Sequence, residues 1–255
     1  MRTMNLNLNP MFRYLISDCL QGMGIFLLVM VLVVGLVPVI ITVSTVGENT
    51  IYFSAYTMAS SIFILVYSIV AIRETLRLGI QHGRGRRSTF LALLLSLCCT
   101  SLLLAVAGQL LSFLGSALWS GRWGVFYTDF YQLIYLQEPG TILSLKQHAE
   151  AFFCNLTLLF AASTVGIFFS LVLFRLNKQW RLVLCIGVPV VFCVVLPGLL
   201  SIFPADAALF RMAAAFGEWF TAAPTAWMLF FLSLAIFVVG LDWLLCRRIT
   251  ITAVK

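Results

Sequence analysis

Long apolar runs separated by short polar segments are the dominant pattern along this chain. A helix that crosses the hydrocarbon core of a bilayer needs about 20 apolar residues. Six runs reach that length, near residues 21–43, 52–72, 88–114, 152–174, 182–203 and 227–246. The pattern therefore predicts an all-α polytopic membrane protein in which residues 1–255 form a single domain of six transmembrane helices.

Two further apolar segments are too short or too interrupted to span. Residues 11–20 have an apolar stripe at helical spacing, which predicts a short interfacial N-terminal helix on the membrane surface. The alternative is that these residues extend the first span. Residues 204–226 lie between two prolines and contain charged residues, and they predict two short re-entrant helices before the last span.

An aromatic stripe marks the predicted external loop, residues 115–151. Large side chains recur there at the spacing of one helical face, at Trp123, Phe126, Tyr127, Phe130, Tyr131 and Ile134. The stripe predicts an amphipathic helix that lies in the outer headgroup region, caps the bundle, or binds an apolar substrate. The last alternative makes Trp123, Phe126 and Phe130 candidate residues of a substrate pathway.

The distribution of basic residues predicts the orientation, because Lys and Arg in short loops accumulate on the cytoplasmic side. Thirteen of the sixteen basic residues fall on one face, which also receives both termini. The N- and C-termini are therefore predicted to be cytoplasmic. The chain is 62% hydrophobic with a net charge of +7 and a mean hydropathy of +1.07, which fits contact with anionic lipid and not with nucleic acid.

The sequence lacks the motifs of several enzyme classes. It contains no G-x-x-x-x-G-K-[ST] phosphate loop, no H-E-x-x-H and no G-x-S-x-G. Its seven cysteines show no zinc-binding spacing. No acidic or basic residue falls in the middle of a predicted span, which argues against ion-coupled transport. Gln109, in the third span, is a candidate for a substrate pathway, and the alternative for it is a hydrogen bond between helices.

Five arginines are concentrated in residues 73–87, between the second and third predicted spans. The run RETLRLGIQHGRGRRSTF that begins at Arg73 resembles the cytoplasmic loop of ABC-2-type permeases, where one bacterial branch has a similar R-E-x-x-R-x-x-x-Q-x-G-x-S-R-x-x-x-F pattern. That branch comprises permease subunits of exporters for antimicrobial or cytolytic peptides, including the phenol-soluble modulin exporter. The chain departs from the pattern at Gly85, where the branch has a hydroxyl residue, and in its longer external loop.

The resemblance implies a cytoplasmic coupling helix that docks on a separate ATPase subunit. Glu74 and the arginines would contact that subunit, the apolar residues would fill its groove, and Gly79, Gly83 and Gly85 would allow sharp turns. The implied coupling residues are Arg73, Glu74, Leu76, Arg77, Leu78, Ile80, Gln81, Gly83, Arg84, Arg86 and Arg87.

The resemblance also implies partners and a location. The chain would be a transport subunit and not an enzyme, ATP and Mg would bind the partner, and this chain would bind no cofactor. A second permease copy would complete the pathway in a bacterial cell membrane, and amphipathic peptides or similar compounds would be exported. Two alternatives stay open. In the first, the arginines bind anionic lipid and not a partner protein. In the second, the chain acts alone as a membrane enzyme or assembly factor, and that function requires a buried polar cluster among the spans.

Overall fold

The computed structural model describes residues 9–44, 51–53, 56–81, 85–119, 125–136, 143–177, 179–180, 183 and 208–247. Within these ranges the chain is helical except for one pair of short strands and a few connecting residues. Five helices are long and apolar enough to cross a membrane, namely α1 (Asn9–Ser44), α2 (Tyr56–Gln81), α3 (Arg86–Trp119), α5 (Leu145–Arg175) and α9 (Pro224–Arg247). They correspond to five of the six predicted spans and confirm a multi-pass helical architecture. The predicted span 182–203 lies outside the described residues apart from Val183.

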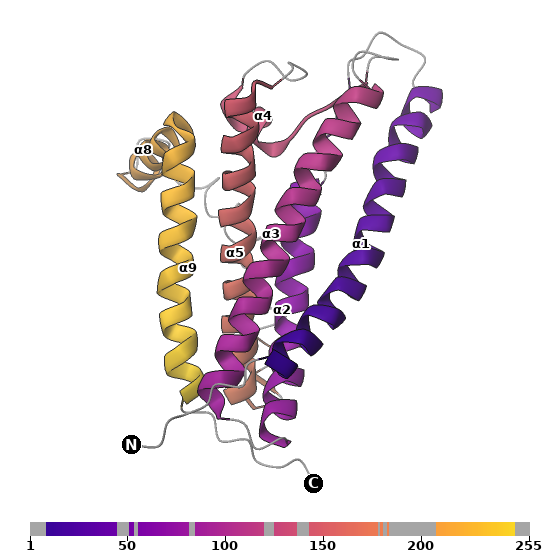
Figure 1. Cartoon of the computed structure of the whole chain (residues 1–255). Helices are drawn as coiled ribbons and strands as arrows, with labels where there is room; N and C mark the ends of the chain where they lie inside the picture. The colour runs from indigo at the N-terminus through magenta and orange to yellow at the C-terminus, as the bar shows by residue number, and fades with distance from the viewer. Residues whose placement is uncertain are drawn as a thin grey trace.

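Three of these helices form the centre of the bundle. Helices α2, α3 and α5 pack on one another, while α1 packs on α3 at one flank and α9 packs on α5 at the other (Figure 1). Small residues make this close packing possible. A Cβ atom on Gly166 of α5 would lie 2.6 Å from the Leu65 carbonyl oxygen of α2, and one on Gly108 of α3 would lie 2.6 Å from the Tyr56 ring. Small residues at helix contacts are the usual device for packing spans in lipid.

The N-terminal segment differs from the prediction of a separate interfacial helix. Helix α1 is one continuous helix of 36 residues that includes residues 11–20. Its apolar stripe faces α3, where Leu15 packs with Ala92 and the Cys19 sulfur lies 2.9 Å from the Thr100 hydroxyl oxygen. Because this stripe is already buried against α3, it is not available to lie on a membrane surface. The alternative, an extension of the first span, describes the structure.

The aromatic stripe also folds differently from the predicted helix. Residues Val125–Tyr127 form strand β2, which pairs in parallel with strand β1 (Ile51–Phe53), and only Phe130–Tyr135 form a helix, α4. Asp129 explains the late start of α4. Its backbone is extended (φ −78°, ψ 155°), and it forms a capping box with Gln132, which fixes Asp129 as the residue before the helix.

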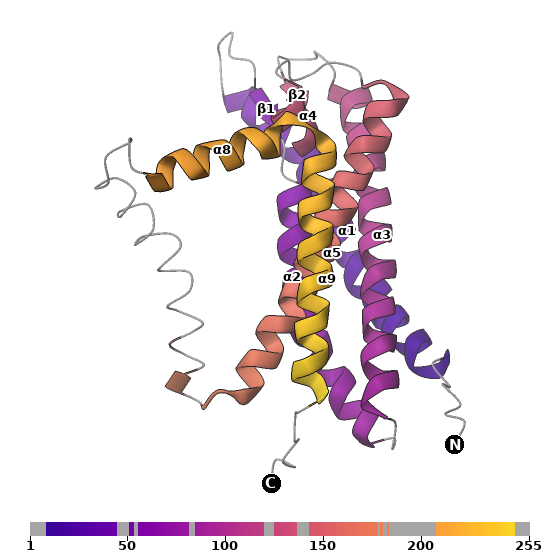
Figure 2. The same cartoon turned by 90° about the vertical axis from the view of Figure 1, so that its left-hand side faces the viewer.

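The region before the last span contains one described helix, α8 (Ala208–Ala222), instead of the two predicted short helices. Only Ala223 separates it from α9, and it extends sideways from the top of α9 (Figure 2). Its aromatic residues are divided between exposed and packed positions: Phe216 and Trp219 are exposed, while Phe220 packs with Trp227 of α9. Such a helix suits a membrane surface better than a re-entrant hairpin.

Charge is distributed unevenly between the two ends of the bundle. The start of α1, the end of α2, the start of α3 and the ends of α5 and α9 lie at the same end of the bundle, and we call this the arginine end (Figures 1 and 2). Its described basic residues are Arg13, Arg73, Arg77, Arg86, Arg87, Arg175 and Arg247. Helices α4 and α8 and the two strands lie at the opposite end. The predicted separation of charge therefore holds among the described residues.

Candidate docking surface and buried polar cluster

The predicted loop 73–87 is mostly helical. Helix α2 continues to Gln81 and α3 begins at Arg86, so the arginine end carries a helical hairpin. Gly85 precedes α3, and its carbonyl oxygen accepts hydrogen bonds from the Ser88 hydroxyl (2.8 Å) and the Thr89 amide (3.2 Å). The side chain of Ile80 and all of His82, Gly83 and Arg84 lie outside the described residues.

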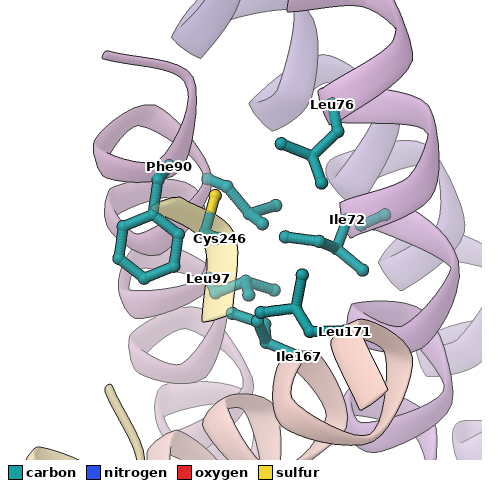
Figure 3. Close-up of a cluster of buried hydrophobic side chains, with 9 residues drawn as sticks. Ile72, Leu76, Phe90, Leu97, Ile167, Leu171 and Cys246 are labelled. Carbon is teal, nitrogen blue, oxygen red and sulfur yellow. The ribbon is translucent and has the colours of Figure 1, made fainter. Parts of the chain in front are cut away.

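The apolar residues of this hairpin face the bundle. Leu76 is 4% exposed and packs with Ile72, Phe90 and Leu171 in one cluster (Figure 3). Leu78 is half-buried against Leu15 and Ala92. In this structure the bundle encloses the Leu76 side chain, so the expected contact with a groove on a partner stays a prediction that would require Leu76 to leave this cluster.

Gly79 has a packing role that differs from the expected sharp turn. It lies inside α2, and a Cβ atom there would approach the Thr89 hydroxyl oxygen of α3 to 2.5 Å and its methyl carbon to 2.8 Å. Gly79 therefore lets the two arms of the hairpin come together. By contrast, a Cβ atom on Gly85 would lie 4.0 Å from its nearest neighbour, the Ser88 hydroxyl oxygen.

Three arginines hold the end of α9. Arg86 of α3 donates a hydrogen bond of 3.2 Å to the Arg247 carbonyl, and Arg175 of α5 donates one of 3.2 Å to the Leu245 carbonyl. The Arg87 guanidinium lies 5.7 Å from the centre of the Trp243 ring. Carbonyl groups in the last turn of a helix lack intrahelical donors and carry a partial negative charge, so cations stabilise them. We call these three residues the arginine clamp.

A polar stripe on α2 is left without a described partner. Glu74, Arg77 and Gln81 follow the i, i+3, i+7 spacing of one helical face and are exposed, and none makes a described hydrogen bond or ion pair. Arg73, next to the stripe, lies 5.3 Å from the centre of the Phe174 ring on α5. We call Glu74, Arg77 and Gln81 the docking stripe, because among the described residues of the predicted coupling segment they form an exposed polar face of α2.

A buried polar cluster lies at the opposite end of the bundle, where α2, α3, α4 and α5 meet. At its centre is Asp129, which is 6% exposed. The Gln109 side-chain amide donates to its Oδ2 (3.3 Å), and the Phe130 amide donates to its Oδ1 (2.8 Å). The Thr57 hydroxyl lies 3.3 Å from Oδ1 of Asp129 and 3.3 Å from Oδ1 of Asn155. His148 extends the cluster, since its Nδ1 lies 3.3 Å from Oε1 of the Gln109 side chain.

The Asp129 carboxyl group has neutral donors and no basic partner among the described residues. Burial raises the pKa of this carboxyl, and the hydrogen bonds from Phe130, Asn155, Gln109 and Thr57 lower it in smaller measure. Burial disfavours the charged form of any acid, while donors that stabilise the anion act in the opposite direction. Burial is the largest of these effects, so the net shift of the Asp129 pKa is upward.

The candidate pathway residues fall into different environments. Gln109 forms the hydrogen bonds between helices that the sequence left as its alternative role. Phe130 packs against Trp227, with ring centres 5.5 Å apart. Phe126 belongs to β2, and Trp123 lies outside the described residues. The structure therefore brings Gln109 and Phe130 to the same end of the bundle, beside α4, and does not describe a shared pocket.

The sequence analysis missed two acids of this kind. The spacing of Asp129 from Gln132 is a recognised signal for a helix start, and the structure uses it as the cap of α4. Asp242 lies in α9 and is fully buried. Burial of both depends on contacts between distant segments, which a single-residue pattern does not display.

Comparisons with known proteins identify no relative. No family model matches the chain, no curated protein matches its sequence, and no solved structure matches its fold. Within the described ranges, no group of three or more His, Cys, Asp and Glu residues is arranged to hold a metal ion.

Proposed function

We propose that this chain is the membrane-spanning permease subunit of an ATP-driven exporter in a bacterial cell membrane. The observation that carries the proposal is the docking stripe on α2, which lies beside the α2–α3 turn at the basic end of the bundle. In the ABC-2-type permeases that the sequence resembles, this place is occupied by the coupling helix. The arginine end would face the cytoplasm, where the ATPase subunit binds.

The packing of α2 supports a mechanical role for the stripe. Ile72 and Leu76 lie on the other side of the same helical turns and are enclosed by Phe90 of α3 and Leu171 of α5. Close-packed interiors transmit strain instead of absorbing it. A partner that displaces the docking stripe would therefore also move α3 and α5.

The arginine clamp extends this linkage to the last span. Arg86 belongs to the same hairpin as the stripe and donates to the end of α9. Movement of the α2–α3 hairpin would therefore displace the end of α9 or break its hydrogen bond with Arg86. A second permease copy, identical or related, would form the export pathway, because the described spans of one copy pack directly on each other through positions such as Gly166.

The proposed substrate class rests on the resemblance to the peptide-exporter branch of these permeases. An amphipathic peptide or a similar compound would enter from the membrane along the apolar outer faces of the spans. ATP and Mg would bind the partner subunit, and this chain would perform no hydrolysis of its own.

Site-specific crosslinking tests the docking assignment. A photoreactive residue is placed at Arg77 or Gln81 in cells that also contain a candidate ATPase subunit. We expect covalent adducts with the ATPase from both positions. The matched control is Lys146, which is exposed at the opposite end. A complex that co-purifies with the ATPase but gives adducts only from position 146 would contradict the proposal.

A stand-alone membrane enzyme or assembly factor is the second candidate, and the buried polar cluster around Asp129 favours it. Acid, amide, hydroxyl and imidazole groups meet there, as such a function requires. Turnover of a substrate by the purified chain without ATP would support this candidate and exclude dependence on an ATPase. Loss of that turnover in Asp129→Asn would assign it to the cluster.

A further inference from the structure

Asp242 is a buried acid without a partner in the described part of the chain. Its side chain is 0% exposed, and neither carboxylate oxygen has a hydrogen-bond partner. It lies on α9 five residues before the helix ends at Arg247, within an apolar segment long enough to span a membrane. Acids inside spans are rare and are usually neutralised by a cation or a proton.

The surroundings of Asp242 are apolar. On the same face of α9, Val238 and Cys246 are one turn away in each direction, and both are buried. Cys246 belongs to the cluster that contains Leu76, Phe90 and Leu171 (Figure 3). The carboxyl group therefore faces the interior of the bundle and not the membrane surface.

The nearby basic side chains are committed elsewhere. Arg86 and Arg175 donate to carbonyl groups at the end of α9, and Arg87 lies over Trp243. The described residues contain no ion pair to Asp242, since the one salt bridge among them joins Lys146 and Glu150. Arg86, Arg87 or Arg175 would have to leave its present partner before it could neutralise this acid.

A metal ion does not fit the site either. Hard cations such as Mg²⁺ or Ca²⁺ require six or more oxygen ligands, and softer metals require several nitrogen or sulfur ligands. In the region that the structure describes, no cluster of three or more ligating side chains occurs near Asp242 or elsewhere. A proton needs only the carboxyl group itself.

We propose that Asp242 is a proton-binding site, and that the bound proton allows the last turns of α9 to pack on α3 and α5. Loss of the proton leaves a carboxylate in apolar surroundings. That charge is relieved when α9 separates from its neighbours and admits water, or when an arginine of the clamp leaves its carbonyl. The site is independent of any ATPase partner.

Other groups near this part of α9 have to be considered in a pH experiment. They are Tyr67 and Arg73 on α2, Arg86 and Arg87 on α3, Arg175 on α5, and Cys246 and Arg247 on α9, with Asp18 of α1 in contact with Tyr67. Arginine keeps its charge at all accessible pH values. Ordinary tyrosine and cysteine lose protons only under alkaline conditions, near pH 10 and about pH 8.5.

Cys246 provides a native reporter of α9 packing, because it is 1% exposed and one turn from Asp242. In a variant with Cys246 as its sole cysteine, reconstituted in lipid nanodiscs, the rate of thiol modification is measured from about pH 6 to about pH 9. The same background with Asp242→Asn is the matched control, because its amide cannot ionise. The ratio of the two rates removes the part of the thiol titration that does not depend on Asp242. A carboxylate at Asp242 would repel the thiolate of Cys246 and slow its modification, which is opposite in sign to the effect of opening.

We expect this ratio to rise with pH, by up to about tenfold per pH unit while the ionised fraction grows. A ratio that stays constant over the whole range would overturn the proposal.

A second measurement needs no substitution. A membrane-soluble carbodiimide adds to protonated carboxyl groups in apolar surroundings, and mass spectrometry locates the adduct. We expect labelling of Asp242 at acidic pH that decreases as the pH rises. Absence of an adduct on Asp242 at every pH, or labelling that does not change with pH, would contradict proton binding at this site.

Discussion

Gln109 of α3 donates a hydrogen bond of 3.3 Å to the carboxylate of Asp129, the N-cap residue of α4. This contact joins α3 to the short helix α4, and strand β2 separates the two helices in the sequence. Thr57 of α2 reaches the same carboxylate, so one acid connects three elements. The end of the bundle that carries α4 is therefore held by buried polar contacts in addition to the apolar cluster around Trp227, whereas apolar packing and the arginine clamp hold the arginine end.

Asp129→Ala should release α4 from the bundle. The substitution removes the cap of α4 and the acceptor of the Gln109 amide, and it leaves Thr57 with Asn155 as its remaining acceptor. The expected loss is about 2–4 kcal/mol of unfolding free energy, measured by reversible unfolding in mixed micelles. Leu133→Ala is the matched control on the same helix, because Leu133 is 58% exposed and should change stability little. Equal effects of the two substitutions would contradict the central role of Asp129.

Stability should also depend on pH through Asp129. Burial raises the pKa of this carboxyl above its ordinary value of 3.8, so the folded chain binds the proton more tightly than the unfolded chain. The stabilising contribution is therefore complete below pH 3.8 and is lost as the pH rises through the folded-state pKa. The Asp129→Asn variant should lack this part of the pH dependence. An unchanged profile in that variant would assign the pH dependence to other groups.

Helix packing at Gly166 gives a third prediction. In Gly166→Ala the new methyl group meets the Leu65 backbone oxygen at 2.6 Å, and a backbone atom cannot move aside cheaply. We expect destabilisation of about 1–3 kcal/mol from this overpacking. Gly240→Ala in α9 is the matched control, because no atom lies within 4 Å of its added Cβ. A comparable loss in both variants would show that α2 and α5 do not approach as described.

The spans were predictable from the sequence because their signal is local. Each needs only a long apolar run, and five such runs became helices at nearly the expected positions. The concentration of basic residues at the arginine end was predictable because it too is visible in short stretches of sequence. The burial of Asp129 was not, since it depends on donors from Thr57 and Gln109 on other helices, whereas its capping box with Gln132 is a local signal for the start of α4.

Residues of the predicted coupling segment show where local patterns fail. The sequence identifies Leu76 as an apolar residue among arginines, which fits a partner's groove or the bundle interior equally well. Only its packing with Phe90 and Leu171 decides between them. Likewise, the role of Gly79 depends on the approach of Thr89 from another helix.

The arginine clamp can be tested apart from the docking stripe. Arg175→Gln removes the charged donor to the Leu245 carbonyl and should weaken the attachment of α9 by about 1 kcal/mol. Faster hydrogen exchange of the amides in the last turn of α9 would report this change. Arg77→Gln serves as the control, because Arg77 makes no described contact. Similar exchange rates in the two variants would mean that Arg175 does not hold α9.

Charge reversal on the docking stripe, with ATP hydrolysis and export measured together, tests ATPase coupling most directly. Glu74→Arg with Arg77→Glu is compared with Lys146→Glu at the opposite end, each reconstituted in vesicles with the candidate ATPase subunit. We predict that the stripe variant loses peptide-stimulated ATP hydrolysis and export, while the Lys146 variant keeps both. Normal stimulated hydrolysis and export in the stripe variant would contradict the proposal that energy enters through α2.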